Sequence, residues 1–261
     1  AQNTSVGFRS LYNNTTASNN TAVGQDALYT NTTGQYNVAL GHSTLVANTT
    51  ASYNTAVGYQ SSYSNTTGAR NVTVGPFSGY ALTTGSGNTF VGAYNTGAGG
   101  AGSNITTGSK NTILGKFNGN EGGLDIRTSS NNIVLSDGDG NVRVHVDSNG
   151  KTRAESYAET SEALSGTTPT VNCNNGNVFT LTTSGNTTFT FSNPPASGTA
   201  YGFTLKLTSG GSHTITYPNT VDFAGGTAPD APASGETDIL VFFTVDGGTN
   251  WYGALSIDAA G

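Results

Sequence analysis

The feature that most constrains this chain is an interval of 17 residues that recurs along its first third. A short pattern opens each interval: asparagine, any residue, a mostly small residue, valine or leucine, then glycine. It begins at Asn3, Asn20, Asn37, Asn54, Asn71 and Asn88. A second pattern, Thr-Thr followed by Gly or Ala, keeps a constant phase with the first. Fixed spacing of this kind is typical of a solenoid, in which each repeat forms one coil and neighbouring coils stack.

The opening pattern of each repeat predicts a short β-strand. Because side chains alternate along a strand, the second and fourth places share one face and the third place lies on the other. We expect the fourth-place valine or leucine to line the coil interior, and a second inward position to be supplied by Leu11, Leu28 and Leu45. The fifth-place glycine suits a corner that needs a positive φ or a close backbone contact. The Asn-Thr-Thr-Gly stretch predicts a turn in which Asn bonds nearby backbone.

Composition narrows the class of protein. Only 24 of the 261 residues are charged, and residues 1–109 contain three charges: Arg9, Asp26 and Arg70. A net charge of −6 provides no basic stripe, which excludes nucleic-acid binding. The longest apolar run, residues 239–243, is too short for membrane insertion as a helix. Gly, Asn and Thr are poor helix formers, so the chain is expected to be all-β and extracellular.

Each coil offers only two or three sizeable apolar side chains, which is a thin core for an isolated solenoid. Three chains around a common axis would bury more surface per chain. The small third-place residues (Ser5, Ala22, Ala39 and Ala56) could allow that close approach. We therefore expect a homotrimer, and a monomeric solenoid with a narrow core remains the alternative.

The rest of the chain divides into three further segments. The solenoid is expected to span residues 1–123, with a late repeat at Asn111, and a degenerate copy of the pattern follows at Asn132. Residues 124–153 predict a β-hairpin connector with a turn at residues 137–141 and with Val142, Val144 and Val146 on one face. The turn lacks the glycine and glutamate that a calcium loop requires. Residues 154–165 predict a short helical or linker segment.

Residues 166–261 predict a C-terminal antiparallel β-sandwich. Six alternating or aromatic-rich runs are separated by turns rich in Gly, Ser and Asn, which is the spacing of a sandwich. The long connection at residues 222–236 is rich in Gly, Pro and Ala. Long loops of this kind are often binding or interface segments.

The sequence indicates no catalysis, no cofactor and no metal site. The repeats contain one acidic residue, the three histidines are scattered, and Cys173 is the only cysteine. Receptor binding is the better-supported chemistry, because aromatic rings can stack on sugars. Repeat tyrosines can supply such rings, and in the C-terminal unit the candidates are Tyr201, Tyr217, Phe223, Trp251 and Tyr252. Trp251 follows a Gly-Gly turn and is expected at the surface.

Four segments carry a resemblance to known proteins. NTAVGQDALYTNTTGQYN and NTAVGYQSSYSNTTGARN resemble repeats of tail fibres from marine and cyanobacterial phages, and also resemble the heads of trimeric autotransporter adhesins. SSNNIVLSDGDGNVRVHVDSNG and the stretch from ALSGTTPTVNC to YGFTLKLT resemble phage fibre modules. The resemblance implies a trimeric receptor-binding fibre on the virion. Such a fibre would continue from upstream fibre segments and touch a host-surface glycan or outer-membrane protein.

Three other functions remain open at this stage. A bacterial cell-surface adhesin or an extracellular filament subunit would share the repeats, and the sequence upstream of this chain would discriminate either from a phage fibre. Ice binding is suggested by threonine at a fixed period. It is disfavoured because neighbouring threonines point to opposite faces, whereas a flat array needs alternate ones.

Overall fold

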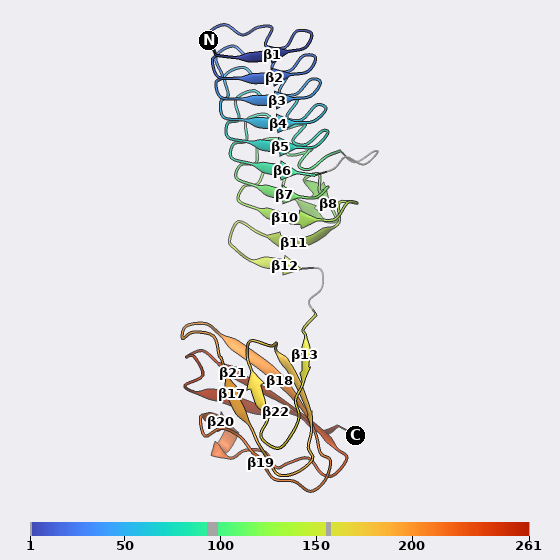
Figure 1. Ribbon diagram of the computed structural model, residues 1–261, viewed down its shortest axis with the longest axis vertical. Coiled ribbons are helices and arrows are strands. Elements are labelled where there is room, and N and C mark those ends of the chain that lie inside the picture. The colour runs from blue at the N-terminus through green and yellow to red at the C-terminus, as the bar shows by residue number, and fades with distance from the viewer. Residues whose placement is uncertain (1, 93–98, 155–157, 261) are drawn as a thin grey trace. The chain divides into compact units, whose positions relative to one another are not determined.

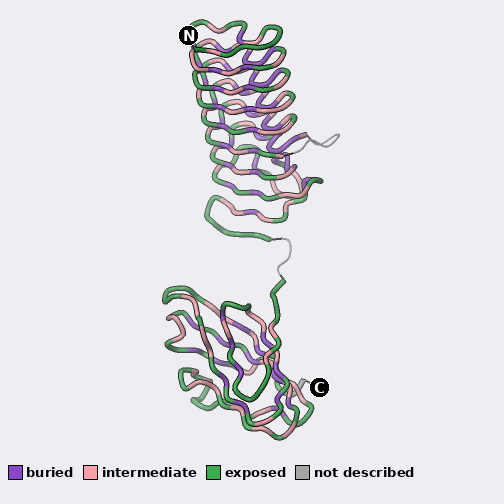
Figure 2. The backbone as a smooth tube through the Cα atoms, viewed as in Figure 1, coloured by how far each residue is buried: buried purple, intermediate pink, exposed green. Residues whose placement is uncertain are grey.

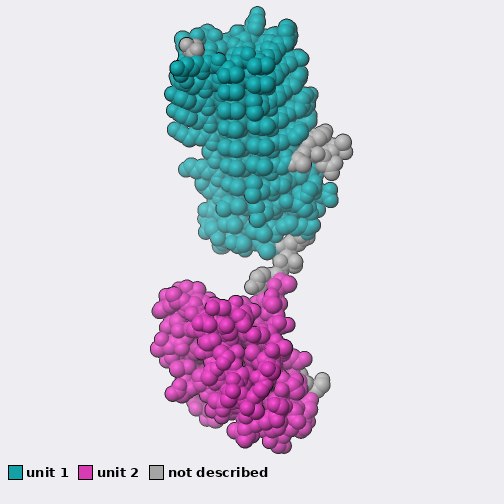
Figure 3. Space-filling view, in the orientation of Figure 1, with its two compact units in different colours: residues 1–156 teal, residues 157–261 magenta. Residues whose placement is uncertain are grey.

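The computed structural model describes residues 2–92, 99–154 and 158–260, which form two compact units (Figures 1 and 3). The first unit spans Ala1–Ser156 and the second Tyr157–Gly261. Both are built of β-strands, and the only helix among the described residues is the 3-10 turn η1 (Ala224–Gly226). Within the same residues, no helix is long and apolar enough to cross a membrane. The expected all-β solenoid, with a further sheet region C-terminal to it in the sequence, is confirmed.

The first unit is a stack of coils, each of which contributes one three-residue strand to a single sheet (Figure 1). Its first strands pair in parallel, with the same place of each repeat opposite its equivalent in the next. These are β1 (Thr4–Val6), β2 (Thr21–Val23), β3 (Val38–Leu40), β4 (Thr55–Val57), β5 (Val72–Val74), β6 (Thr89–Val91) and β7 (Thr112–Leu114). The predicted 17-residue period therefore sets the register of the sheet.

The two faces of these strands are reversed relative to the prediction. The third-place side chains of Ala22, Ala39 and Ala56 are fully buried inside the coils, whereas the fourth-place side chains point outward and are partly exposed (Figure 2). Space explains the reversal, because the coil is narrow and its interior also receives Leu28 and Leu45. A small residue is needed where the strand faces inward, so the third place is not a contact between chains.

Glycine at the fifth place allows adjacent coils to stack closely, as predicted. Gly58 has φ 127°, and a Cβ atom there would lie 2.7 Å from the backbone of Gly75 in the next coil. That approach is too short for any side chain, so every coil needs its corner glycine.

Two columns of buried asparagines hold the coils together. In the first column, Asn54 Nδ2 donates to the Gly68 carbonyl (2.9 Å), and Asn54 Oδ1 accepts from the backbone N–H of Asn71 (2.9 Å). In the second, Asn48 Nδ2 donates to Asn31 Oδ1 (2.8 Å) and to the carbonyl of Ala51 (3.1 Å). Each amide thus satisfies turn backbone that the narrow coil has buried.

The second column ends where the repeat loses its asparagine. Asn65 Oδ1 is buried without a hydrogen-bond partner, and the equivalent place in the next coil is Leu82. From that coil onward larger apolar side chains fill the interior, including Phe90, Ile113 and Phe117. The second column therefore gives way to apolar side chains, while the first continues through Asn88, Asn111 and Asn132.

The sheet continues beyond the predicted solenoid boundary at residue 123. A small hairpin, β8 (Asn120–Glu121) and β9 (Leu124–Asp125), interrupts the coils. After it, β10 (Ile133–Ser136) pairs in parallel with β7, and β11 (Val142–Val146) and β12 (Thr152–Ala154) extend the same sheet in antiparallel fashion. The predicted turn between β10 and β11 is present, but the predicted connector is the end of the solenoid sheet.

A β-bulge corrects the prediction that three valines of β11 share one face. The register between β10 and β11 shifts after Leu135, so that Val144 pairs with Leu135 but Val142 pairs with Ser136. The extra residue turns Val142 toward the interior, where it packs against the apolar cluster of the last coils.

Residues 154–165 were predicted to be helix or linker, and the helical alternative is wrong over the residues that the structure describes. Residues 152–154 form β12, and Ser161–Ala163 form β13, which pairs in parallel with a strand of the second unit. Residues 155–157 lie outside the described residues. Pairing with the edge strand of a sheet outweighed the weak helical spacing of this short segment, because tertiary pairing readily overrides local helix propensity.

The second unit is a mixed sheet with two small parallel pairs, rather than the predicted antiparallel sandwich. Its six-stranded sheet has the order β13-β15-β18-β21-β22-β20, and the small pairs are β14-β17 and β16-β19. The bounds are β14 (Thr170–Asn172), β15 (Val178–Thr182), β16 (Thr187–Thr188), β17 (Thr190–Ser192), β18 (Tyr201–Thr208), β19 (Ile215–Thr216), β20 (Val221–Phe223), β21 (Thr237–Thr244) and β22 (Trp251–Ala260).

The order of these pairings explains the departure. Strands β14, β15 and β16 pair in parallel with β17, β18 and β19, each with the strand three places later in the chain. The unit therefore begins as two stacked coils, and only β18, β21 and β22 pair in antiparallel fashion. An aromatic core lies between the layers, with Phe179, Phe203, Phe242 and Trp251 all buried.

Candidate functional site

The most extensive unusual surface is the outward face of the solenoid sheet. It consists of the second-place and fourth-place residues of β1–β7 and of β10, all of which are threonine, valine, leucine or isoleucine. Val6 is 57% exposed, Leu114 44% and Ile133 47%. We call this surface the outer strand face. Soluble monomers rarely leave a continuous apolar strip of this kind in water.

Tyrosines of the repeats form columns beside the coils. The rings of Tyr12 and Tyr29 stack with centroids 5.5 Å apart, and those of Tyr36 and Tyr53 with centroids 5.0 Å apart. Arg70 covers Tyr53, with its guanidinium carbon 5.8 Å from the ring centroid. Stacking between coils occupies ring faces that a sugar would need, so these columns chiefly support the coil-to-coil contacts.

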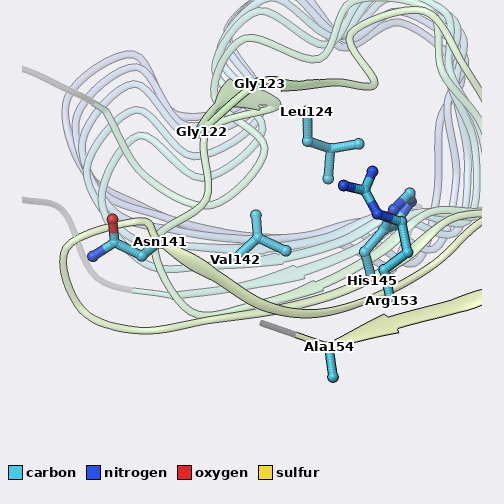
Figure 4. Close-up of a pocket in the computed structure, with 8 residues that line it drawn as sticks. All are labelled: Gly122, Gly123, Leu124, Asn141, Val142, His145, Arg153 and Ala154. Atoms are coloured by element: carbon cyan, nitrogen blue, oxygen red, sulfur yellow. The ribbon is translucent and has the colours of Figure 1, made fainter. Parts of the chain in front are cut away.

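A cavity of about 300 Å³ opens at the last strands of the first unit. Figure 4 shows Leu124 and Val142 pointing into it from opposite sides, with Arg153 and His145 along one wall. The cavity exists because the β11–β12 hairpin extends the sheet without completing another coil. It is the open end of the solenoid interior.

His145 in this wall is buried. Its Nε2 lies 3.1 Å from Asn132 Oδ1, and the Asn132 amide nitrogen donates to Asn111 Oδ1 and to Ser129 and Ser130. Nε2 must therefore carry the hydrogen, which leaves Nδ1 as a buried lone pair with no partner. Burial, followed by the nearby Arg153, holds the pKa of His145 below its usual range. A cation beside a single imidazole disfavours a metal ion here.

A second cavity, of about 280 Å³, brings together two of the predicted receptor-binding residues. Tyr217 and Phe223 line it with ring centroids 5.1 Å apart, and the exposed residue Asp222 also lies along it. Tyr217 also stacks on Phe189 at 5.8 Å, and burial raises the pKa of its hydroxyl. We call this site the aromatic cavity. It combines apolar rings with an exposed acceptor, which suits a ligand having both C–H and O–H groups.

The other three predicted residues lie elsewhere. Trp251 is only 1% exposed and packs against Phe191 and Phe203 in the core, so its expected surface position is wrong. It begins a central strand, and a Gly-Gly turn upstream does not decide which way that strand faces. Tyr201 is half-buried, and its hydroxyl donates to the Gly176 carbonyl. Tyr252 is 56% exposed and lies on the outward face of the second unit's sheet.

The described residues contain no group of three or more His, Cys, Asp or Glu side chains able to hold a metal ion. Cys173 is buried, and burial raises the pKa of its thiol, which makes it a poor nucleophile.

Sequence reasoning missed the outer strand face as a surface and missed the open end of the solenoid. The apolar fourth place was visible in every repeat, but it was assigned to the interior. The open end depends on a hairpin replacing a coil, which no local pattern signals.

Comparisons with protein-family models, with curated proteins and with solved structures found no match to this chain.

Proposed function

We propose that this chain is part of a phage tail fibre, trimeric and extracellular, that attaches the virion to a host cell. In this proposal the solenoid is a rigid spacer, and the C-terminal unit binds a surface glycan or an outer-membrane protein. The observation that carries the proposal is the combination of a charge-poor, regular rod with a separate unit that contains the aromatic cavity.

The construction of the first unit suits a spacer. Ten strands about 4.8 Å apart give the sheet a length of roughly 43 Å. Buried asparagines bond each coil to the next, so bending the rod would leave amides and carbonyls without partners. A low charge density also avoids the stacking of like charges along the rod.

The aromatic cavity supports the binding part of the proposal. The rings of Tyr217 and Phe223 can contact the C–H face of a sugar while the Asp222 carboxylate accepts hydrogen bonds from its hydroxyl groups. Two aromatic residues and one acidic residue in a cavity of this size match a single sugar unit better than an extended protein surface.

Binding of labelled protein to cells and glycans tests the proposal. The full chain would be added to a panel of marine and cyanobacterial cells and to immobilised lipopolysaccharides purified from them. We expect binding to at least one member, with affinity about tenfold lower for Asp222→Asn, since hydrogen bonds to a charged acceptor are worth roughly 1.5–3 kcal/mol. The matched control is Asp230→Asn, an equal charge change at an exposed position eight residues later in the chain and outside the cavity.

Failure of the chain to bind any cell or lipopolysaccharide would count against an attachment function. Equal affinities for Asp222→Asn and the unmodified chain would remove the aromatic cavity as its site.

A further inference from the structure

We propose that the outer strand face is the seam along which three copies of this chain meet, with the coils of all copies in register. The inference rests on the proposed trimeric fibre and deepens it, because it names the contact surface. It replaces the contact expected from the sequence, since the small third-place residues are enclosed within the coils.

The composition of the face favours burial. Its fourth-place row is Val6, Val23, Leu40, Val57, Val74, Val91, Leu114 and Leu135. Its second-place row consists of five threonines, two valines and one isoleucine, and neither row contains a charged side chain from β1 to β7 or in β10. Charges are scarce throughout residues 1–109, so the distinguishing feature of this face is that eleven of its sixteen residues are aliphatic. A solvated sheet face normally carries polar residues instead, which indicates a surface that water does not cover.

The apolar character persists where the repeat sequence does not. In β10 the consensus is lost, yet Ile133 and Leu135 still point outward and are 47% and 39% exposed. On β11 their cross-strand partners Val146 and Val144 extend the same surface. Internal stacking of the coils does not require these outward valines and leucines, so contact with another surface accounts for their recurrence.

The shape of the face selects further copies of the same chain as its occupant. Each strand contributes only two outward residues, so the face is a narrow strip that repeats about every 4.8 Å. A second and third copy have the same spacing, and placing them side by side in parallel matches every coil with its equivalent. The fourth-place row of one copy can then pack against the second-place row of the next, and three such contacts close a ring.

The apolar area that the outer strand face exposes is comparable in size with a protein–protein interface. The eight most exposed residues of the face leave on the order of 500 Å² of apolar surface in water, the upper end of what a soluble monomer presents. Contacts with two neighbours together would use more than this strip, because flanking atoms are covered as well, and would approach the roughly 800 Å² per partner of a standard interface.

Light scattering after size-exclusion chromatography tests the seam with the full chain. The double variant Leu40→Lys, Leu114→Lys places two cations on the face, and its matched control is Thr33→Lys, Thr107→Lys on exposed turn positions of the coils immediately before them. We expect the unmodified chain and the control to have three times the 26.4 kDa chain mass. The face variant should have the mass of one chain, with an unchanged far-ultraviolet circular dichroism spectrum.

The possible outcomes distinguish a failure of the proposed seam from a failure of the proposed trimer. A monomeric unmodified chain would overturn the trimer itself. A trimeric unmodified chain whose lysine face variant is also trimeric would overturn only the seam. If the lysine variant does not fold, Leu40→Thr, Leu114→Thr keeps strand-forming residues and must weaken the trimer at least tenfold, and no weakening overturns the seam.

Discussion

The two units of this chain use the same stacking of parallel strands but stabilise their interiors by different means. The regular coils of the solenoid enclose alanine and leucine beside columns of asparagine, whereas the C-terminal unit encloses phenylalanine and tryptophan. A 17-residue coil is too narrow for aromatic rings and must satisfy its own turn backbone, so amide side chains occupy much of its interior. Where the coil widens near Phe90, the second asparagine column has ended, while the first continues as far as Asn132.

This difference predicts two unfolding behaviours in one chain. The solenoid should lose stability by small equal steps as hydrogen bonds are removed, because each coil contacts only its neighbours. The C-terminal unit should unfold in a single cooperative step that depends on few large side chains. Trp251, the only tryptophan, reports on the second unit alone.

The largest expected effect is in the aromatic core. Phe242→Ala should lower the free energy of unfolding of the C-terminal unit by about 4 kcal/mol, because Phe242 is buried among Phe203, Tyr217 and Phe223. Tryptophan fluorescence during urea unfolding measures this change. The neighbouring Phe243 is 45% exposed on the other face, so Phe243→Ala should cost far less. Equal losses for both variants would contradict the assignment of the core.

The second-largest expected effect is in the first asparagine column. Asn54→Ala removes two buried hydrogen bonds. It leaves the Asn71 N–H without a partner and the Gly68 carbonyl with Asn65 Nδ2 alone, which should cost about 2 kcal/mol. Circular dichroism during thermal unfolding follows the solenoid, while tryptophan fluorescence should stay unchanged. Asn104→Ala, at an exposed position, is the control and should have little effect. A loss as small as that of the control would mean that the column does not hold the coils together.

A smaller effect of opposite sign is expected from backbone conformation. Gln60 has φ 53°, a left-handed conformation that side chains disfavour. Gln60→Gly should therefore stabilise the solenoid by about 1 kcal/mol. Gln60→Ala removes the same polar group but retains a Cβ atom, so it should not stabilise. Differential scanning calorimetry compares the two variants, and an equal shift for both would exclude a backbone origin.

The smallest expected effect is on the stability of the solenoid at low pH. Hydrogen bonds from Asn141, followed by the contact with Arg143, hold the pKa of Asp137 well below its usual range. A depressed pKa in the folded state stabilises the β10–β11 turn above the unfolded pKa, and that stabilisation is lost as pH falls below about 4. The thermal midpoint of the solenoid should fall over this range and fall less in Asp137→Asn. Parallel pH profiles for the two proteins would assign the acid sensitivity to other carboxylates.

Local patterns predicted much of the solenoid but not its inside and outside. The recurrence of Asn54 and Gly58 at a fixed interval predicted stacked coils, corner glycines and turn-bonding asparagines, because all of these are set within one repeat. Alternation also placed Ala56 opposite Thr55 and Val57. It could not tell which face was enclosed, since that depends on the width of the closed coil.

Residues whose positions depend on distant pairing were predicted poorly. Tyr217 and Phe223 do meet in one cavity, but Trp251 lies in the core because β22 pairs with both β21 and β20. The parallel pairing of β15 with β18 joins residues 26 positions apart, such as Val178 and Thr204, and no local signal specifies it. Such pairings also converted the expected helix into β12 and β13.

The central claim, that the apolar face of a polar-cored solenoid joins copies of the chain, is tested most directly by the mass of the unmodified protein in solution. Sedimentation equilibrium over a wide range of protein concentration should give three times the 26.4 kDa chain mass. A mass of one chain at every concentration would contradict the account.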